Sequence, residues 1–207
     1  MKKIFEITDK KIIQELLDNI EFGTLSICLD NKPYSLPLNF AQIEEDIYFH
    51  GSKSGRKIKI LKQNNYASFS VVKSYSIIQS YFSSTDELAC PATHFFKSIV
   101  IDGEIEFVEN YHEKVKALTA LMKKLQPEER YKPLSEDDYK KAINATTIYK
   151  LKPKETKAKF KFGQHLSSER FEMILTHLES RDSAVDKDTI EIMQQLRGQN
   201  ETSKPLV

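Results

Sequence analysis

The chain has 207 residues, of which 40% are hydrophobic and 29% are charged, proportions typical of a globular protein with a sizeable core. Its 31 basic and 30 acidic residues give a net charge of +1, which argues against a dedicated nucleic-acid-binding protein because such proteins carry a marked basic excess. The two cysteines, Cys28 and Cys90, form no CxxC pair, so we expect no disulfide framework and a reducing, cytoplasmic location. No apolar run reaches the ~20 residues of a membrane helix, and the charged N-terminus lacks the form of a signal peptide, so we expect no membrane partner.

The first half of the chain is predicted to begin with a helix and to continue as an antiparallel meander. Residues 8–19 place apolar side chains at helical spacing, and Thr8 or Asp9 can cap this helix. A second helix is predicted over residues 55–65. Alternating apolar and polar residues predict four short strands, at 23–30, 34–43, 47–51 and 66–72.

The second half combines strands with longer helices. Residues 73–96 have a weaker pattern, with room for a strand and then a loop that carries Pro91. A strand is predicted over 98–109, broken or bulged at Gly103, and a strand pair or one interrupted strand over 146–162. Helices are predicted at 111–125, 137–145, 167–179 and 186–199, and a frayed end at 200–207.

The order of these elements favours an α+β fold over a doubly wound parallel sheet. The strands mostly follow one another in sequence and few helices come between them, which is typical of an antiparallel β-barrel with helical decorations. The helices after the last strand form a helical C-terminal tail. We predict a barrel domain over residues 1–162 and a helical extension over residues 163–207 that packs on the barrel.

One stretch, residues 48–61 (YFHGSKSGRKIKIL), places small hydrogen-bonding residues and cations between a strand and a helix. A phosphate needs several converging donors with little side-chain bulk, and an arginine can bind two of its oxygens at once. The start of the predicted helix directs its positive end to the same place. The spacing of a Walker loop is absent. The stretch therefore indicates a phosphate site, and the alternative is a solvated basic turn.

A row of lysines in the last predicted strand has two interpretations. Their near-alternating spacing places them on one strand face in each half of the row. They either protect a solvated edge strand from aggregation or form a positive rim that attracts an anion. The row consists of Lys150, Lys152, Lys154, Lys157, Lys159 and Lys161.

Other motifs are missing from the sequence. The five histidines and two cysteines show no metal-ligand spacing, so we predict no metal site. No GxGxxG occurs, so a built-in nicotinamide domain is not expected.

Two blocks of the sequence resemble a known family. Residues 33–72 contain, in order, a PLNF strand, an IYFHG strand, a GRK helix start and an NN turn; residues 95–124 contain a strand with an internal glycine and then a helix. In this order they resemble the FMN-binding split β-barrels of the pyridoxamine 5′-phosphate oxidase type, most closely the nitroimidazole-resistance and flavin-nucleotide-binding branch. The likeness covers residues 10–160. It implies FMN as the cofactor and a homodimer with flavin sites at the subunit interface.

The resemblance also implies roles for individual residues. The backbone of one strand would line the isoalloxazine ring, through Leu36, Pro37, Leu38, Asn39 and Phe40. The ribityl chain and phosphate would lie along His50, Gly51 and Ser52, with Arg56 and Lys57 holding the phosphate. Ser98 falls where the oxidases have a glutamine that touches the flavin from the partner subunit.

The C-terminus departs from the oxidases. Their Arg-x-His-Arg ending is absent, so we do not expect pyridoxamine oxidation. The ending is instead similar to that of some flavin-binding regulators, with Lys161, Gln164 and His165 in matching places. A loop over the flavin edge would add further candidate residues on the substrate side, namely Cys90, Thr93 and His94.

The resemblance implies an FMN-dependent oxidoreductase that reduces a small aromatic, nitro or quinone-like acceptor, with NAD(P)H as a transient donor. No catalytic residue is identified. Two alternatives remain open: a flavin-binding sensor or regulator without turnover, and a haem-binding or haem-degrading protein of the same fold. The regulator-like ending motivates the first, and the spare histidines, above all His165, motivate the second.

Overall fold

The computed structural model describes residues 2–202 of the chain. Contacts divide it into two compact units. Unit 1 comprises the described parts of Met1–Ile7, Val72–Ser98 and Ala158–Val207, and unit 2 comprises Thr8–Val71 and Ile99–Lys157. Compactness does not establish which segments fold independently, so the predicted division at residues 162 and 163 stays a prediction.

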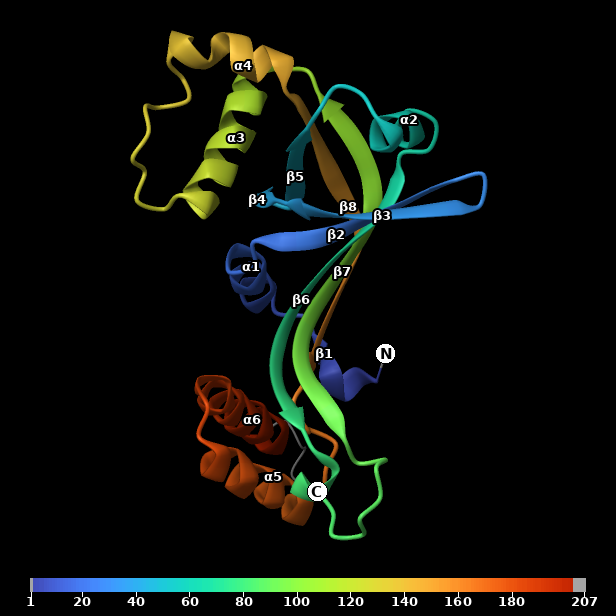
Figure 1. The fold of residues 1–207 in the computed structure, drawn as a ribbon, viewed down its shortest axis with the longest axis vertical. Helices are drawn as coiled ribbons and strands as arrows, with labels where there is room; N and C mark the ends of the chain where they lie inside the picture. Colours follow the sequence, from blue (N-terminus) through green and yellow to red (C-terminus); the bar gives the residue numbers. More distant parts are fainter. Residues whose placement is uncertain (1, 203–207) are drawn as a thin grey trace. The chain divides into compact units, whose positions relative to one another are not determined.

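The described residues contain one eight-stranded sheet, and Figure 1 labels its strands and the helices. The strands are β1 (Glu6–Ile7), β2 (Phe22–Leu29), β3 (Lys32–Asn39), β4 (Ala41–Ile43), β5 (Asp46–Gly51), β6 (Tyr66–Ile78), β7 (Thr93–Val108) and β8 (Thr147–Lys161). The α-helices are α1 (Lys10–Asp18), α2 (Arg56–Leu61), α3 (Tyr111–Leu125), α4 (Lys140–Ala145), α5 (Ser168–Arg181) and α6 (Ala184–Thr202). Short 3₁₀ turns are η1 (Lys3–Phe5), η2 (Ser80–Phe82) and η3 (Asp137–Tyr139).

The strand order is β3-β2-β6-β7-β8-β5-β4, and β1 pairs with β8. The pairings β1–β8, β2–β3, β2–β6, β4–β5 and β5–β8 are antiparallel. The predicted α+β class, with an antiparallel sheet and a helical C-terminal tail, is confirmed. The predicted frayed end begins inside α6, and its residues 203–207 lie outside the described part of the chain.

Side-chain caps explain where three helices begin. The side chain of Asp9 accepts hydrogen bonds from the backbone N–H groups of α1, that of Asn110 caps α3, and that of Ser167 caps α5. Each of these side chains replaces a partner that the first turn of a helix lacks. Of the two caps predicted for the first helix, Thr8 or Asp9, the structure has Asp9, and α3 has the predicted bounds.

The predicted meander is correct only in part. The strand predicted over 34–43 is two strands, β3 and β4, which separate at Phe40. Phe40 is fully buried, and its ring lies edge-on to that of Phe69, with 4.9 Å between centroids. After this residue the chain starts a new hairpin, β4–β5, whose other neighbour is β8. Phe40 therefore ends the pairing with β2 instead of continuing it.

The predicted break at Gly103 does not occur, and the predicted bulge there stays a prediction. Strand β7 continues through this glycine. A Cβ atom at Gly103 would lie 2.0 Å from the carbonyl oxygen of Lys152 on β8, a distance that no side chain can occupy. The glycine permits close approach of two backbones.

The lysine row lies on β8, whose edge away from β7 is paired only at its two ends: β5 pairs with Thr147–Leu151, and β1 pairs with Ala158 and Lys159. Lys152, Lys154 and Lys157 lie between these pairings, so for them the interpretation as a solvated edge strand stays a prediction. Strand β8 lies between β7 and β5. Glutamates of β7 approach two of the lysines: Lys152 lies 3.6 Å from Glu106, and Lys154 lies 3.5 Å from Glu104. These exposed pairs stabilise the fold by less than ~1 kcal/mol each, but they neutralise the charge of this part of the row.

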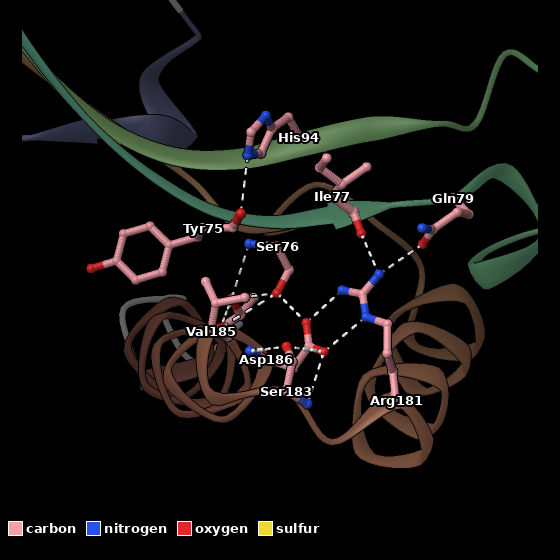
Figure 2. A network of polar contacts seen from close by, with 10 residues as sticks. Tyr75, Ser76, Ile77, Gln79, His94, Arg181, Ser183, Val185 and Asp186 are labelled. Atoms are coloured by element: carbon pink, nitrogen blue, oxygen red, sulfur yellow. Dashed lines mark hydrogen bonds and ion pairs between the residues drawn. The ribbon is translucent and has the colours of Figure 1, made fainter.

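An ion pair between a buried carboxylate and a partly exposed guanidinium attaches the two C-terminal helices to β6 within unit 1 (Figure 2). The Asp186 carboxylate, at the start of α6, is fully buried. It accepts hydrogen bonds from the guanidinium of Arg181 and from the hydroxyls of Ser76 and Ser183. Arg181 also donates to the Ile77 carbonyl at 3.0 Å. The guanidinium, followed by the hydroxyl donors, holds the pKa of Asp186 far below its usual range despite burial.

Candidate phosphate loop and flavin-facing strand

The basic loop lies between β5 and α2, both in unit 2. Helix α2 has six residues and is shorter than predicted. Its dipole is therefore small, and the loop's own groups must provide most of the attraction for an anion. The Ser52 hydroxyl donates to the Ser54 carbonyl at 2.7 Å, which tightens the turn before the helix.

Two glycines give the loop its shape. Gly55 has φ 117° and ψ 178°, a conformation that only glycine adopts without strain. A Cβ atom at Gly51 would lie 2.9 Å from Lys57 Nζ, so the ammonium group lies directly over this glycine. The small residues predicted from the sequence thus leave space for the lysine that they face.

Arg56 and Lys57 are held by aromatic rings and not by carboxylates. The Arg56 guanidinium carbon lies 4.3 Å from the ring centroid of Tyr34 on β3, so the loop adjoins the strand predicted to line the flavin ring. Lys57 Nζ lies 4.7 Å from the ring centroid of Tyr149. Among residues 2–202, no acidic side chain forms an ion pair with either cation. Both charges are therefore available to an anionic ligand.

Desolvation lowers the pKa values of two groups in this loop. It lowers the pKa of Lys57. It also lowers the pKa of His50, with a smaller contribution from the positive charge of Lys57. A bound anion would raise both values, because it stabilises the protonated forms.

Tyr149 contributes a buried polar group without a partner. Its ring is fully buried and stacks on Phe49, with 5.3 Å between centroids. Its hydroxyl makes no hydrogen bond within the described chain, and burial raises its pKa well above the usual range. Such unpaired buried groups are rare and call for an explanation. A ligand or a water molecule reaching this hydroxyl would provide the missing partner.

Strand β3 has one free edge among the described residues, because it pairs only with β2. Pro33 and Pro37 lie opposite Cys28 and Thr24 of β2, and proline is tolerated on an edge strand where its missing N–H would face outward. In an antiparallel pair, every second residue directs its backbone N–H and C=O groups toward the partner strand, and the residues between direct these groups away from it.

The outward N–H groups on this edge therefore belong to Ser35 and Asn39, which share the alternation of the two prolines. Of the residues predicted to line the flavin ring, Leu36 and Leu38 direct their amides to β2. Asn39 and Phe40 follow them at the end of the strand. The Asn39 side chain donates to the Glu21 carbonyl at 3.1 Å, and the Phe40 side chain belongs to the core.

Four of the six residues predicted on the substrate side line one cavity of about 310 Å³ within unit 1. They are Cys90, Thr93, Lys161 and His165. The other two lie outside its lining. His94 Nε2 lies 2.8 Å from Ser74 Oγ and 3.0 Å from the Tyr75 carbonyl. Gln164 is buried and closes a turn by hydrogen bonds to the backbone of Phe160 and Phe162.

Ser98, the remaining predicted flavin contact, is half-buried on β7 in unit 1, and its role stays a prediction. No group of three or more potential metal ligands occurs within residues 2–202. No helix in that part of the chain is long and apolar enough to cross a bilayer.

A comparison with family models decides the family. The model described as pyridoxamine 5′-phosphate oxidase matches residues 9–160. The chain belongs to the pyridoxamine 5′-phosphate oxidase family. This is a family of flavin-binding split-barrel proteins, so the resemblance stated from the sequence is confirmed. No curated protein matched the chain.

Three solved structures share the fold of this family member. A candidate 5-nitroimidazole antibiotic resistance protein from Bacteroides thetaiotaomicron is 22% identical, with a TM-score of 0.60 over 74% of this chain and 85% of the other. The FAD and haem binding protein from Mycobacterium smegmatis is 20% identical, with a TM-score of 0.63 over 75% and 73%. The flavocytochrome Anf3 from Azotobacter vinelandii is 21% identical, with a TM-score of 0.60 over 78% and 72%. At these identities the likeness shows the fold alone.

Sequence reasoning missed Tyr149 and Arg170. Tyr149 looks like an ordinary buried strand residue in the sequence, and only its unpaired hydroxyl beside Lys57 distinguishes it. Arg170 lines the same cavity as Lys161 and His165. Arg170 lies nine residues after Lys161, on α5, and only the fold brings the two side chains to one cavity.

Proposed function

We propose that the protein binds FMN in unit 2 and uses it to reduce a small aromatic, nitro or quinone-like acceptor. The observation that supports this most is the pair of cations in the loop beside β3, Arg56 and Lys57. Neither has an acidic partner within residues 2–202. Lys57 is half-buried, and charges removed from water are usually paired. Membership of a flavin-binding family supports FMN as the anion that they hold.

The chain's residues would divide the binding of FMN between them. Arg56 and Lys57 would neutralise the phosphate, and the backbone of the loop at His50, Gly51 and Ser52 would approach it closely. The free edge of β3 would offer the Ser35 and Asn39 N–H groups to the polar edge of the ring. Bound FMN supplies two-electron redox chemistry, and the protein supplies orientation and a partly apolar surrounding.

We also propose a homodimer in which a second copy covers one face of the β3-β2-β6 sheet. Small polar side chains alternate on this face, and three of them lie side by side because Ser26 pairs with both Ser35 and Ser68. Large exposed hydrophobic side chains continue the same strand, namely Tyr66 and Val72 of β6. A flat face of small groups beside exposed apolar ones supports an interface, and it would place β3 and its flavin next to the partner subunit.

The experiment is to purify the protein and to identify any flavin that it retains or takes up. Absorbance would show the flavin, and chromatography of the released cofactor would separate FMN from FAD. Oxidation of NAD(P)H with a nitroaromatic acceptor would then separate an oxidoreductase from a sensor. Absence of flavin binding, even after reconstitution with excess FMN, would refute the proposal.

The haem-binding alternative is tested in the same spectra. Two of the similar structures are named for haem or as a flavocytochrome, and His165 is exposed in this chain. A Soret band that appears on haem addition and disappears in His165→Ala would favour that alternative.

A further inference from the structure

The cavity in unit 1 is a second place where positive charge collects without acidic partners. Its wall comes from the loop after η2, the start of β7, the end of β8, the turn after β8 and helix α5. Figure 1 shows η2 and the loop that follows it beside α5. All of these segments belong to one unit, so the cavity does not depend on how the two units are arranged.

Three nitrogen-bearing side chains face this cavity: Lys161, His165 and Arg170. Within residues 2–202, Lys161 Nζ donates to the hydroxyl of Thr93. Arg170 donates through Nε and Nη2 to the carbonyl and hydroxyl of Ser83, at 2.8 and 3.3 Å. Within residues 2–202 neither Lys161 nor Arg170 is paired with a carboxylate, and no acidic residue lines the cavity.

The Arg170 guanidinium is positioned by its contacts with Ser83, which is itself buried. These contacts use one side of the guanidinium and leave Nη1 available. A fixed guanidinium with a free N–H side is suited to planar oxygen anions, which it binds with little further loss of side-chain freedom.

The positive charges of the side chains at this cavity repel one another. Burial lowers the pKa of Lys161, and the neighbouring charge of Lys159 lowers it further. Burial also lowers the pKa of His165, followed by the charges of Lys2, Lys161 and Arg170. Each named neighbour is positive, so an anion in the cavity would relieve repulsion that no protein group relieves.

The rest of the wall is apolar. Phe95 and Ile174 are buried behind it, and Pro91 and Leu166 are half-buried at its sides. A volume of about 310 Å³ is at the small end of ligand pockets. The cavity therefore suits a ligand with one anionic group and a short apolar body, smaller than a flavin nucleotide.

We propose that this cavity binds a small organic anion, a carboxylate or a phosphate monoester, whose charged group contacts Lys161 and Arg170 and whose apolar part lies against Phe95 and Ile174. The proposal is independent of flavin binding, because the basic loop of unit 2 contributes nothing to this cavity.

The experiment measures binding of benzoate and phenyl phosphate by calorimetry, with benzamide as the uncharged counterpart of benzoate. If the cavity accepts both carboxylates and phosphate monoesters, benzoate and phenyl phosphate should both bind more tightly than benzamide. If only one of the two anions binds, that result identifies the class of ligand. Lys161→Gln and Arg170→Gln should each weaken anion binding at least about tenfold. Lys161→Arg keeps the charge and should retain binding, and Lys187→Gln, which removes an exposed charge on α6, should leave it unchanged.

Cys90 provides a local readout, since it is exposed and lines the cavity. In a Cys28→Ser background, bound anion should slow alkylation of Cys90 by iodoacetamide. The variant Arg56→Gln/Lys57→Met should bind both probes as the parent does, which distinguishes this cavity from the phosphate loop. Binding of benzamide as tight as that of benzoate, no binding of either anion, or equal binding by Lys161→Gln and the parent would each overturn the proposal.

Discussion

Removing the two charges of the phosphate loop should weaken binding of FMN without weakening binding of riboflavin. The change is the double variant Arg56→Gln/Lys57→Met. Methionine keeps the apolar stem of Lys57 over the ring of Tyr149, which lies 4.7 Å from Nζ in the parent. Riboflavin has the same ring and ribityl chain as FMN but no phosphate, so only the phosphate contacts differ between the two ligands.

The magnitude follows from the two contacts. A hydrogen bond to a charged group contributes about 1.5–3 kcal/mol. Arg56 is exposed and Lys57 is half-buried, so solvent screening favours the lower end for Arg56. A total of about 3 kcal/mol corresponds to a loss of about a hundredfold in affinity. The affinity for riboflavin should change less than about threefold.

The assay is quenching of flavin fluorescence, titrated at low and high salt. FMN affinity of the parent should fall with salt, and this dependence should be weaker in the double variant because screening acts on the charges that were removed. The control is Lys59→Gln/Lys62→Met, which removes two exposed charges from the same helix region. If the ratio of FMN to riboflavin affinity is the same in parent and double variant, the loop does not hold the phosphate.

Four further predictions follow from the structure. Asp186→Asn should lower the free energy of unfolding by about 1.5–3 kcal/mol, because it removes the charge that strengthens the hydrogen bonds of this buried carboxylate. Asp182→Asn, in an exposed pair with Lys187, should cost less than ~1 kcal/mol. Equal costs in thermal or urea unfolding would contradict the network of Figure 2. Since the folded pKa of Asp186 is lowered, its contribution is complete above the unfolded value of ~3.9. This contribution is lost as pH falls below that value, so the stability of Asp186→Asn should converge with that of the parent in acid. Burial lowers the pKa of Lys124 to about 8. Between this pH and the unfolded value of ~10.4 the unfolded state binds more protons, so the stability of the parent should rise with pH relative to that of Lys124→Met. Parallel stability–pH profiles of the two proteins would refute this. Gly103→Ala should cost about 1–3 kcal/mol or more because its Cβ meets the Lys152 carbonyl, whereas Gly198→Ala, whose Cβ meets no atom within 4 Å, should be neutral or stabilising.

The local part of the fold was accessible from the sequence, and the pairing of distant strands was not. The bounds of α3 were predicted from helical spacing, and the start of α1 was predicted from a cap residue. In the sheet, β2 pairs with β6 and β8 pairs with β5, although the two strands of each pair are far apart in sequence. Local patterns contain no information on such pairings, and a fully buried residue such as Phe40 looks like any strand residue until its core neighbours are known.

The candidate site divides in the same way. Gly51, Gly55, Arg56 and Lys57 were identified because a phosphate needs small residues and cations in one short segment, and spacing within a segment is visible in sequence. The hydroxyl of Tyr149 and the edge position of β3 depend on neighbours from other segments. The alternation of Pro33 and Pro37 was nevertheless a visible signal for a free edge, since a proline in a central strand would remove a ladder hydrogen bond.

Charge spacing alone does not distinguish a binding lysine from a structural one. Lys57 and Lys154 both look like members of basic stretches, but a β7 glutamate lies beside Lys154 whereas Lys57 has only an aromatic ring. The same contrast occurs within the lysine row, where Lys152 faces Glu106 and Lys161 faces a hydroxyl. A paired cation gains little from a ligand, because the ligand must compete with the carboxylate already present. An unpaired, partly desolvated cation gains the full interaction, and this is the physical reason for assigning anion binding to the loop around Lys57 and to the cavity around Lys161.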